Sequence, residues 1–428
     1  MRRFRFSAPG FQAAFSAFVA ERRETPEEVD TLVRDVLAAV RAEGVGALLR
    51  YAREFDKIEL TEATLRVTGE EIAEGAAACS AEVREAIAFA AARIRAYHER
   101  QRPADQRFTD QAGVELGWRW TPIEAVGIYV PGGRAAYPST VLMNAVPAAV
   151  AGVDRIAMVT PPGRLQPAVL AAAQIAGVTE IWRVGGAQAV AALAYGAGPI
   201  KPVDKIVGPG NAFVTAAKRR VYGTVGIDAL AGPSEIVVVA DAANDPQWIA
   251  ADLLSQAEHD PAAQSILITD DEDFAAKVEA AVLEQLSTLS TGEDAAASWR
   301  DHGAVVIAPL EEAPALVNEI APEHVEFALD DPERLADRVR HAGAIFLGRH
   351  APEAIGDYVA GSNHVLPTSR AARFSSGLSL YDFIKRTSFV KCDAESFARL
   401  APATIALAEA EGLPAHARSA AIRLGQGR

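Results

Sequence analysis

Short apolar runs alternate with alanine-rich stretches of helical character through most of the chain beyond Trp118. A first series contains VGIYV (126–130), RIAMV (155–159) and EIWRV (180–184). A second series follows residue 235 and contains EIVVVA, SILIT, AVVIA, VEFAL and GAIFL. Apolar runs of this length that are separated by helices indicate βαβ units, whose parallel strands are buried on both faces. The alternation therefore predicts two α/β layers.

Helical patterns flank the two series. Residues 25 to 105 predict helices, the first of which is capped by Thr25 with Pro26 in its first turn. From about Ser379 onward, strands give way to helices, with Asp393 as the cap of one of them. The sequence thus predicts a helical N-terminal part and a helical C-terminal tail around an α/β core.

The fold class that follows is α/β, with two incomplete Rossmann-like domains built on parallel-type sheets. No internal repeat or Pro/Ser-rich linker occurs, so we expect packed units, and residues 288–300 (STLSTGEDAAASW) predict an exposed loop. The expected division is a helical segment 1–25, a discontinuous first α/β domain 26–128 and 236–378, a second Rossmann-like domain 129–235, and a tail 379–428.

Composition narrows the class of protein. The chain has 428 residues, half of them hydrophobic, and a formal net charge of −14, which argues against a nucleic-acid partner because phosphate backbones require clustered Lys and Arg. Cys79 and Cys392 are too few for a disulfide framework. The basic opening segment is interrupted by Ser, Gln and Pro, so it predicts neither a signal peptide nor a membrane span. We therefore expect a cytoplasmic protein.

Four apolar runs of the first series end in glycine, as VGIYVPGG, RVGGAQ, KIVGPGN and LAGPSE. In an open parallel sheet, ligands bind beyond the carboxyl ends of the strands, where helix amino termini offer N–H groups to anions. The standard G-x-G-x-x-G fingerprint is absent. Tyr129, Gln188 and Asn211 lie in or just after these turns and could hold a nicotinamide nucleotide, although each could equally stabilise its own turn.

One predicted helix, from Pro246 to about His259, carries two candidate metal ligands. Gln256 and His259 are three residues apart and therefore share one face of the helix. Histidine is a common zinc ligand, whereas a glutamine amide is a rare one. On the residues alone, the alternative that His259 stabilises the carboxyl end of the helix is favoured.

Further candidates lie in irregular segments. Asp357 and His364 belong to GDYVAGSNHVLPTSRAARFSSGLS, which is too rich in Gly, Ser and Asn for regular structure and could equally be a long surface loop. His416, near Glu411 in EGLPAHARS, has no local feature that distinguishes it from a solvated tail histidine.

Glu323 and His324 are adjacent in APEHVEFA, just where an apolar strand begins. Adjacent residues within a strand point to opposite faces, so the pair could not serve one site from inside the strand. Pro322 ends the preceding helix, which places the pair in the connection before VEFAL, where irregular backbone can direct both side chains together. The alternative is a capping Glu323 and a half-buried His324.

Taken together, the motifs resemble one family. GIYVPGGRAAYPSTVLMNAVPA, VGGAQAVAALAYG, KIVGPGNAFVTAAKR, AGPSEIVV, LLSQAEHDP, APEHVEFAL, GSNHVLPTSRAARFSSGLSLYDFIKRTSF and EGLPAHARS occur in this order, from about residue 25 to the C-terminus. In these motifs the chain is similar to the histidinol dehydrogenases. Ser369 and Arg370 depart from the small residues that the family pattern leads us to expect.

The resemblance implies the oxidation of L-histidinol through an aldehyde to L-histidine, the last step of histidine biosynthesis, with two NAD⁺ reduced in turn. It implies a homodimer with a shared active site, NAD binding by the domain 129–235, and a C-terminal tail that contributes to the dimer and the site. By residue matching it implies the following roles: zinc ligands Gln256, His259, Asp357 and, from the partner chain, His416; substrate contacts Ser234, Gln256, His259, His324, Asp357, His364, Glu411 and His416; NAD contacts Tyr129, Gln188 and Asn211; acid/base residues Glu323 and His324.

The chemistry gives the last two residues separate tasks. A neutral imidazole can take the hydroxyl proton as hydride leaves carbon, so His324 is the expected base, and Glu323 is the candidate that activates water for the aldehyde hydrate. Three alternatives remain: a zinc- and NAD-dependent dehydrogenase of another small polar alcohol, a zinc hydrolase that uses the same ligands, and a non-enzymatic zinc-bridged dimer.

Overall fold

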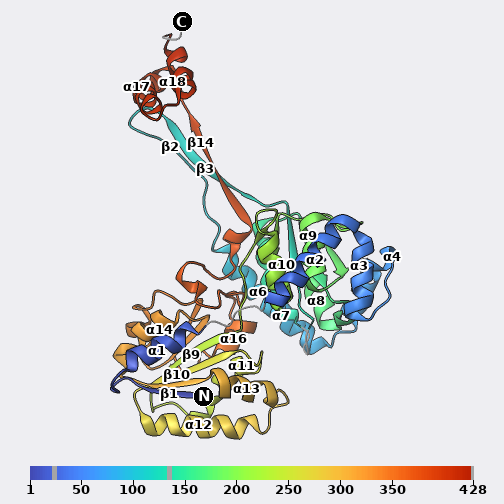
Figure 1. The fold of residues 1–428 in the computed structure, drawn as a ribbon, viewed down its shortest axis with the longest axis vertical. Coiled ribbons are helices and arrows are strands. Elements are labelled where there is room, and N and C mark those ends of the chain that lie inside the picture. Colours follow the sequence, from blue (N-terminus) through green and yellow to red (C-terminus); the bar gives the residue numbers. More distant parts are fainter. Residues whose placement is uncertain (22–26, 133–136, 426–428) are drawn as a thin grey trace. The chain divides into compact units, whose positions relative to one another are not determined.

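The computed structural model describes residues 1–21, 27–132 and 137–425, which form two compact units (Figure 1). The first unit comprises Met1–Gln101 and Ile123–Phe383, and the second comprises Arg102–Pro122 and Ile384–Arg428. The predicted helix cap at Thr25, with Pro26, lies outside the described residues.

A six-stranded, fully parallel sheet forms one half of the first unit, in the order β1-β11-β10-β9-β12-β13. Alternate residues of its strands enter two separate cores: Val237 and Phe327 pack with α1 and α14, whereas Ile236 and Leu267 pack with α11, α12 and α13. Burial on both faces explains the continuous apolar runs. The strands are β1 (Arg2–Arg5), β9 (Glu235–Ala240), β10 (Gln264–Thr269), β11 (Ala304–Ile307), β12 (His324–Ala328) and β13 (Ala344–Leu347).

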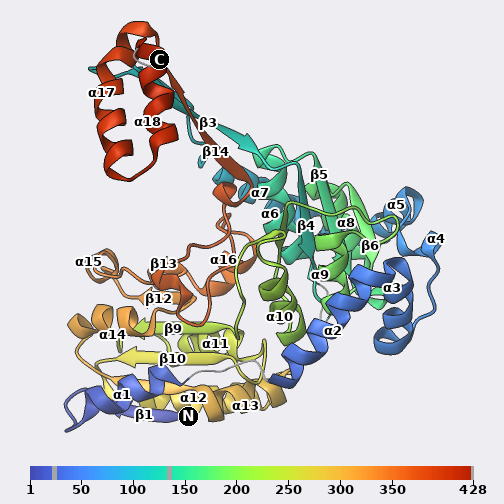
Figure 2. The ribbon, with the colours of Figure 1, turned by 45° about the horizontal axis from the view of Figure 1, so that its top comes forward.

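A five-stranded parallel sheet forms the other half, in the order β6-β5-β4-β7-β8. On one face α2, α9 and α10 pack against one another and against the sheet (Figure 2). The helices α7 and α8 contact each other and α6, and α8 also contacts α5. The strands are β4 (Ala125–Tyr129), β5 (Arg155–Thr160), β6 (Glu180–Arg183), β7 (Lys205–Val207) and β8 (Gly226–Ile227).

Two parallel sheets with covering helices confirm the predicted α/β class. The α-helices of the first unit are α1 (Phe11–Ala20), α2 (Glu27–Glu43), α3 (Val45–Tyr51), α4 (Glu62–Leu65), α5 (Gly69–Ala77), α6 (Ala81–Glu99), α7 (Pro138–Ala151), α8 (Pro167–Ala176), α9 (Gly186–Tyr195), α10 (Ala212–Val221), α11 (Pro246–Ala257), α12 (Glu272–Leu286), α13 (Gly292–His302), α14 (Ala313–Ile320), α15 (Glu333–Ala336) and α16 (Glu353–Tyr358). None of the described helices is both long and apolar enough to cross a membrane.

The second unit combines an antiparallel sheet with the helical tail. Its strands β2 (Gln106–Thr109), β3 (Glu115–Pro122) and β14 (Ile384–Lys391) pair in the order β14-β3-β2. Two helices that pack together follow, α17 (Ala394–Ala410), capped by Asp393, and α18 (Pro414–Ala421). The helical tail is confirmed, but the expectation that strands end near Ser379 is wrong. β14 (IKRTSFVK) mixes charged and polar residues with a few apolar ones and is largely exposed, so it lacks the continuous apolar run of a buried strand.

The predicted exposed loop at 288–300 is also wrong. Most of it forms α13, in which Ala295 and Trp299 are buried against α11 and α12. Ser and Thr at the start of the segment resemble a loop, but they precede the helix, which begins at Gly292, and the apolar face that packs on the core begins only at Ala295. Tertiary packing thus decided the state of this segment.

Candidate active site

The Glu323 and His324 pair lies at the amino edge of the six-stranded sheet. Helix α14 ends at Ile320 and is followed by Ala321, whose backbone is left-handed with φ of 52°; Pro322 then leads the chain into β12. Glu323 precedes the strand as predicted, but His324 is its first residue, paired in register with Ile236 of β9. The expectation that both precede the strand was wrong for His324, because pairing with β9 extends β12 by one residue.

Glu235, the first residue of β9, holds both side chains through its peptide groups. Its N–H donates to Oε2 of Glu323 at 3.0 Å, and its carbonyl oxygen accepts from Nδ1 of His324 at 3.1 Å. Oε2 of Glu323 then lies 3.7 Å from Nδ1 of His324. A carbonyl can only accept, so a neutral His324 carries its proton on Nδ1 and presents Nε2 as its basic nitrogen.

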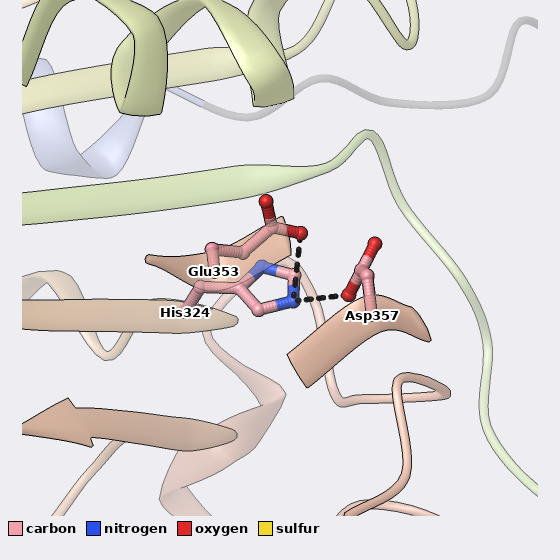
Figure 3. Close-up of side chains that lie close together, drawn as sticks. All are labelled: His324, Glu353 and Asp357. Carbon is pink, nitrogen blue, oxygen red and sulfur yellow. Dashed lines mark ion pairs between the residues drawn. The ribbon is translucent and has the colours of Figure 1, made fainter. Parts of the chain in front are cut away.

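Nε2 of His324 faces two carboxylates of helix α16 (Figure 3). It lies 3.7 Å from Oδ1 of Asp357 and 3.9 Å from Oε1 of Glu353. Glu353 and Asp357 are four residues apart and therefore share one face of this helix. The expectation of irregular backbone was thus wrong for Asp357, because α16 extends through the start of the Gly-rich segment as far as Tyr358. Among the described residues, these three side chains form a group whose ligand atoms are close enough together to hold a metal ion.

Burial and charge shift the pKa values of these groups. Burial raises the pKa of Glu323 to about 7. Burial acts to lower the pKa of His324, but the nearby carboxylates, Glu323 first and then Asp357, outweigh it and raise that pKa to about 10. Burial would raise the pKa of Asp357, yet its contact with His324 and the charge of His364 hold that pKa well below its usual range. The carboxylates thus stabilise the imidazolium form of His324.

Gln256 and His259 meet at the carboxyl end of α11. The helix ends at Ala257, and the N–H of His259 bonds to the carbonyl of Gln256, which keeps the predicted spacing of the two side chains. Nε2 of Gln256 lies 2.9 Å from Nδ1 of His259, which is 3.4 Å from Oγ of Ser234. Within the described part of the chain, the buried Oε1 of Gln256 has no hydrogen-bond partner.

An orphaned buried amide oxygen is costly unless something binds it. A cation would bind it, and the His259 and Asp357 side chains supply the nitrogen and carboxylate ligands that zinc accepts. The imidazole of His259 keeps some solvent exposure, but the surrounding protein lowers its pKa, which favours the neutral form that a metal ligand requires. The residues present therefore fit a zinc ion.

Two further predicted substrate residues lie at the same place. Nδ1 of His364 donates to the carbonyl of Asp357 at 3.0 Å, and burial lowers the pKa of His364. Ser234 immediately precedes β9 and contacts His259. The structure thus brings together the following predicted residues: Ser234, Gln256, His259, Glu323, His324, Asp357 and His364. Glu411 and His416 belong to the second unit, where both are exposed.

The three predicted NAD residues lie at the carboxyl edge of the five-stranded sheet. Tyr129 ends β4, and its hydroxyl oxygen accepts a hydrogen bond from the N–H of Gly186 at 3.0 Å, while burial raises its pKa to about 12. Gln188 is buried in the first turn of α9. Asn211 is exposed and caps α10, accepting from the N–H groups of Phe213 and Val214. Tyr129 and Asn211 therefore stabilise their own turns, and they do so at the carboxyl edge of the sheet, where a ligand could bind.

Sequence reasoning missed the site residues Glu235 and Glu353. Oγ of Ser255 on α11 donates to Oε2 of Glu353 at 3.1 Å, so Glu353 links the helix that carries Gln256 to the helix that carries Asp357. Its spacing of four from Asp357 was a usable signal. Glu235 could have been found as a carboxylate that opens an otherwise apolar strand.

Ser369, which departs from the family pattern, lies beside Glu235. Its N–H donates to Oε1 of Glu235 at 3.2 Å, and both Ser369 and Arg370 have left-handed backbone, with φ of 54° and 67°. This segment therefore supports the strand residue that holds Glu323 and His324.

Fold and site together define an α/β enzyme with a buried carboxylate–imidazole pair beside ligands suited to a metal ion. The model of the histidinol dehydrogenase family matches residues 19–424. Histidinol dehydrogenase of Caulobacter vibrioides is 80% identical over 427 residues, which covers 100% of both chains, and that of Mesorhizobium japonicum is 62% identical over 98% of both. The crystal structure of histidinol dehydrogenase from Elizabethkingia anophelis matches with a TM-score of 0.94 and 37% identity, over 99% of this chain and 98% of that one.

This chain belongs to the histidinol dehydrogenase family. It is accordingly an enzyme, an oxidoreductase of histidine biosynthesis.

Proposed function

We propose that this enzyme oxidises L-histidinol through L-histidinal to L-histidine, with two NAD⁺ as hydride acceptors. The observation that carries the proposal is the Glu323 and His324 pair, held by one peptide of β9 next to the ligand group of Gln256, His259 and Asp357. A related dehydrogenase of another small polar alcohol is the alternative, because a scaffold does not fix its substrate.

Zinc is the proposed metal, held by Gln256, His259, Asp357 and His416 of a second copy of the chain. The orphaned Oε1 of Gln256 supports this ligand set. When bound, the ion would offset the charge of Asp357 and orient the amine and imidazole nitrogens of the substrate. Ser234, His364 and, from the tail, Glu411 are the further proposed substrate contacts. The assembly proposed is therefore a homodimer with a shared active site.

His324 and Glu323 act in turn in the proposed mechanism. Nε2 of His324 takes the hydroxyl proton while hydride leaves the carbon that carries the hydroxyl. This step needs the neutral imidazole, which a zinc ion on Asp357 would favour by offsetting the charge of that carboxylate. Glu323 then takes a proton from water as the water oxygen adds to the aldehyde carbon, and the imidazolium of His324 returns its proton to the former carbonyl oxygen. His324, neutral again, takes a hydroxyl proton of this hydrate during the second hydride transfer. A carboxyl group whose pKa is raised to about 7 is a stronger base than an ordinary glutamate, which suits the hydration step.

NAD is proposed to bind at the carboxyl edge of the five-stranded sheet, near Tyr129, Gln188 and Asn211. Ligands of open parallel sheets bind where the strand order reverses, and this sheet reverses between β4 and β7. The cytoplasm is the proposed compartment, which the free thiols of Cys79 and Cys392 support.

Stoichiometry tests the proposed reaction. We expect about two NADH per L-histidinol consumed, because each of the two oxidations delivers one hydride. We also expect activity to be lost after dialysis against a chelator, because the zinc-free enzyme no longer orients the substrate, and to be restored by Zn²⁺. No NADH from L-histidinol would contradict the proposed substrate, and full activity without zinc would contradict the metal.

The pH dependence of the second half-reaction tests the role of Glu323. The reactive form is the carboxylate, which is populated above its pKa of about 7. We expect log kcat/KM for L-histidinal oxidation to fall more steeply with decreasing pH below about 7 than above it, because protonated Glu323 cannot take a proton from water. Stopped-flow measurement of NADH formation from L-histidinal would check this, and the inflection should be missing from Glu323→Gln. The same inflection in that variant would contradict the assignment.

A further inference from the structure

The turn Gly208–Asn211 follows β7 at the point where the order of the five-stranded sheet reverses. The chain runs outward from β4 through β5 to β6, and then returns to place β7 on the other side of β4. The carboxyl ends of β4 and β7 therefore flank the crevice in which such sheets bind nucleotides. The turn lies on one side of this crevice and Tyr129 on the other.

Gly208 is fixed on both of its peptide groups. Its N–H donates to Oδ2 of Asp228 at 2.7 Å, and its carbonyl accepts from Nζ of Lys218 at 2.9 Å. Its backbone is left-handed with φ of 107°, and a Cβ here would lie 2.3 Å from the carbonyl oxygen of Tyr129. Only glycine permits this approach of the two strand ends, so the turn starts from one defined backbone position.

Lys218 and Asp228 form a buried ion pair. Nζ of Lys218 bonds to Oδ1 of Asp228, and the side chains are only 3% and 5% exposed. Desolvation of two charges offsets most of what their attraction contributes, so stability alone is a weak reason for such a pair. Both charged groups also bond to the backbone of Gly208.

We propose that the Lys218–Asp228 pair positions the turn 208–211 for the dinucleotide and fixes the position of this turn relative to the substrate site. This inference rests on the proposed use of NAD at this edge. Neither residue touches the proposed reacting atoms, so both are positioning residues. Their effect passes through the backbone of Gly208 to Asn211, whose exposed side chain caps α10.

The link to the substrate site runs along the segment that follows Asp228. Oδ1 of Asp228 also accepts from the N–H of Ala229 at 2.6 Å, and Oγ1 of Thr215 on α10 donates to the carbonyl of Ala231 at 3.2 Å. The segment then reaches Ser234, which contacts His259. One helix, α10, thus holds the start of the nucleotide turn and the chain that leads to the metal ligands.

Three variants test the proposal: Lys218→Met, Asp228→Asn and the double variant. Each single change leaves one buried charge without its partner and should lower Tm, whereas the double change removes both charges and should recover most of that loss. In all three variants we expect Kd for NAD⁺, measured by calorimetry on the full chain, to rise about tenfold or more, because Gly208 loses charge-assisted hydrogen bonds. The turnover rate at saturating NAD⁺ should also fall, while zinc content stays at the wild-type value.

Glu180→Gln provides the matched control. Glu180 pairs with Arg155 at the opposite, amino edge of the same sheet, with side chains 13% and 24% exposed. This variant should keep the wild-type Kd for NAD⁺ even where Tm falls. Wild-type NAD⁺ affinity in the double variant would overturn the positioning role. A wild-type enzyme that binds no NAD⁺ would instead overturn the proposed function on which it rests. All affinities are compared at a temperature where circular dichroism shows every variant folded, so loss of fold does not enter the result.

Discussion

Glu323→Gln is expected to abolish most oxidation of L-histidinal while leaving much of the first oxidation, that of L-histidinol, intact. The amide keeps the shape of the side chain but cannot take a proton from water, and losing a general base costs roughly 10²–10⁴ in rate. Single-turnover NADH formation should therefore stop near one NADH per L-histidinol instead of about two. Rapid-quench detection of accumulated aldehyde would confirm the block.

His324→Gln is the comparison variant for this experiment. Because Nε2 of His324 is the proposed base at both hydride transfers, its loss should slow both oxidations by a similar factor. An equal loss of both half-reactions in Glu323→Gln would remove the separate role of Glu323. Zinc content should be measured in both variants, since Nε2 of His324 lies only 3.7 Å from Asp357, a proposed zinc ligand.

Hybrid dimers should recover activity that neither parent variant has. His416→Asn and Gln256→Ala each remove one proposed ligand, so each homodimer should lose zinc and most activity. If His416 comes from the second copy, a mixed dimer contains one site without either ligand and one site with both. About half of the wild-type activity per dimer is then expected, from that one intact site of the two.

The heterodimer should be isolated by two different affinity tags before assay and zinc analysis. A dimer of two Gln256→Ala chains, carrying the same tags, is the matched control and should stay inactive. Genuine heterodimers that remain inactive would show that the ligands Gln256 and His416 come from the same chain.

Much of the site was predictable because several of its residues sit in strong local patterns. The spacing of Gln256 and His259 followed from a helix of known period, and Pro322 placed Glu323 outside its strand. The spacing of Glu353 from Asp357 could have indicated a shared helix face, but nothing in its neighbourhood shows that Ser255 and His324, both distant in sequence, lie against it. The peptide of Glu235, which aligns the pair, carries no sequence signal because every residue has one.

The protonation state of His324 also could not be predicted from the sequence, which led us to expect a neutral imidazole near pH 7. Its environment is set by carboxylates from α16 and from the residue before β12, which stabilise the imidazolium. Charge–charge interactions depend on distances of a few ångströms. Such distances between α16 and β12 arise only when both elements pack on one sheet edge.

The sequence by itself determined the two parallel sheets, their covering helices and the helical tail, because burial on two faces and helical periodicity leave their mark on local composition. It also supplied the candidate residues. Tertiary structure alone decided that the site lies at the amino edge of the six-stranded sheet, where strand starts meet the ends of α11 and α16. It also decided that 292–302 form a helix and that 384–391 form a strand. These outcomes depend on which distant surfaces pack together, and local residue patterns do not record such pairings.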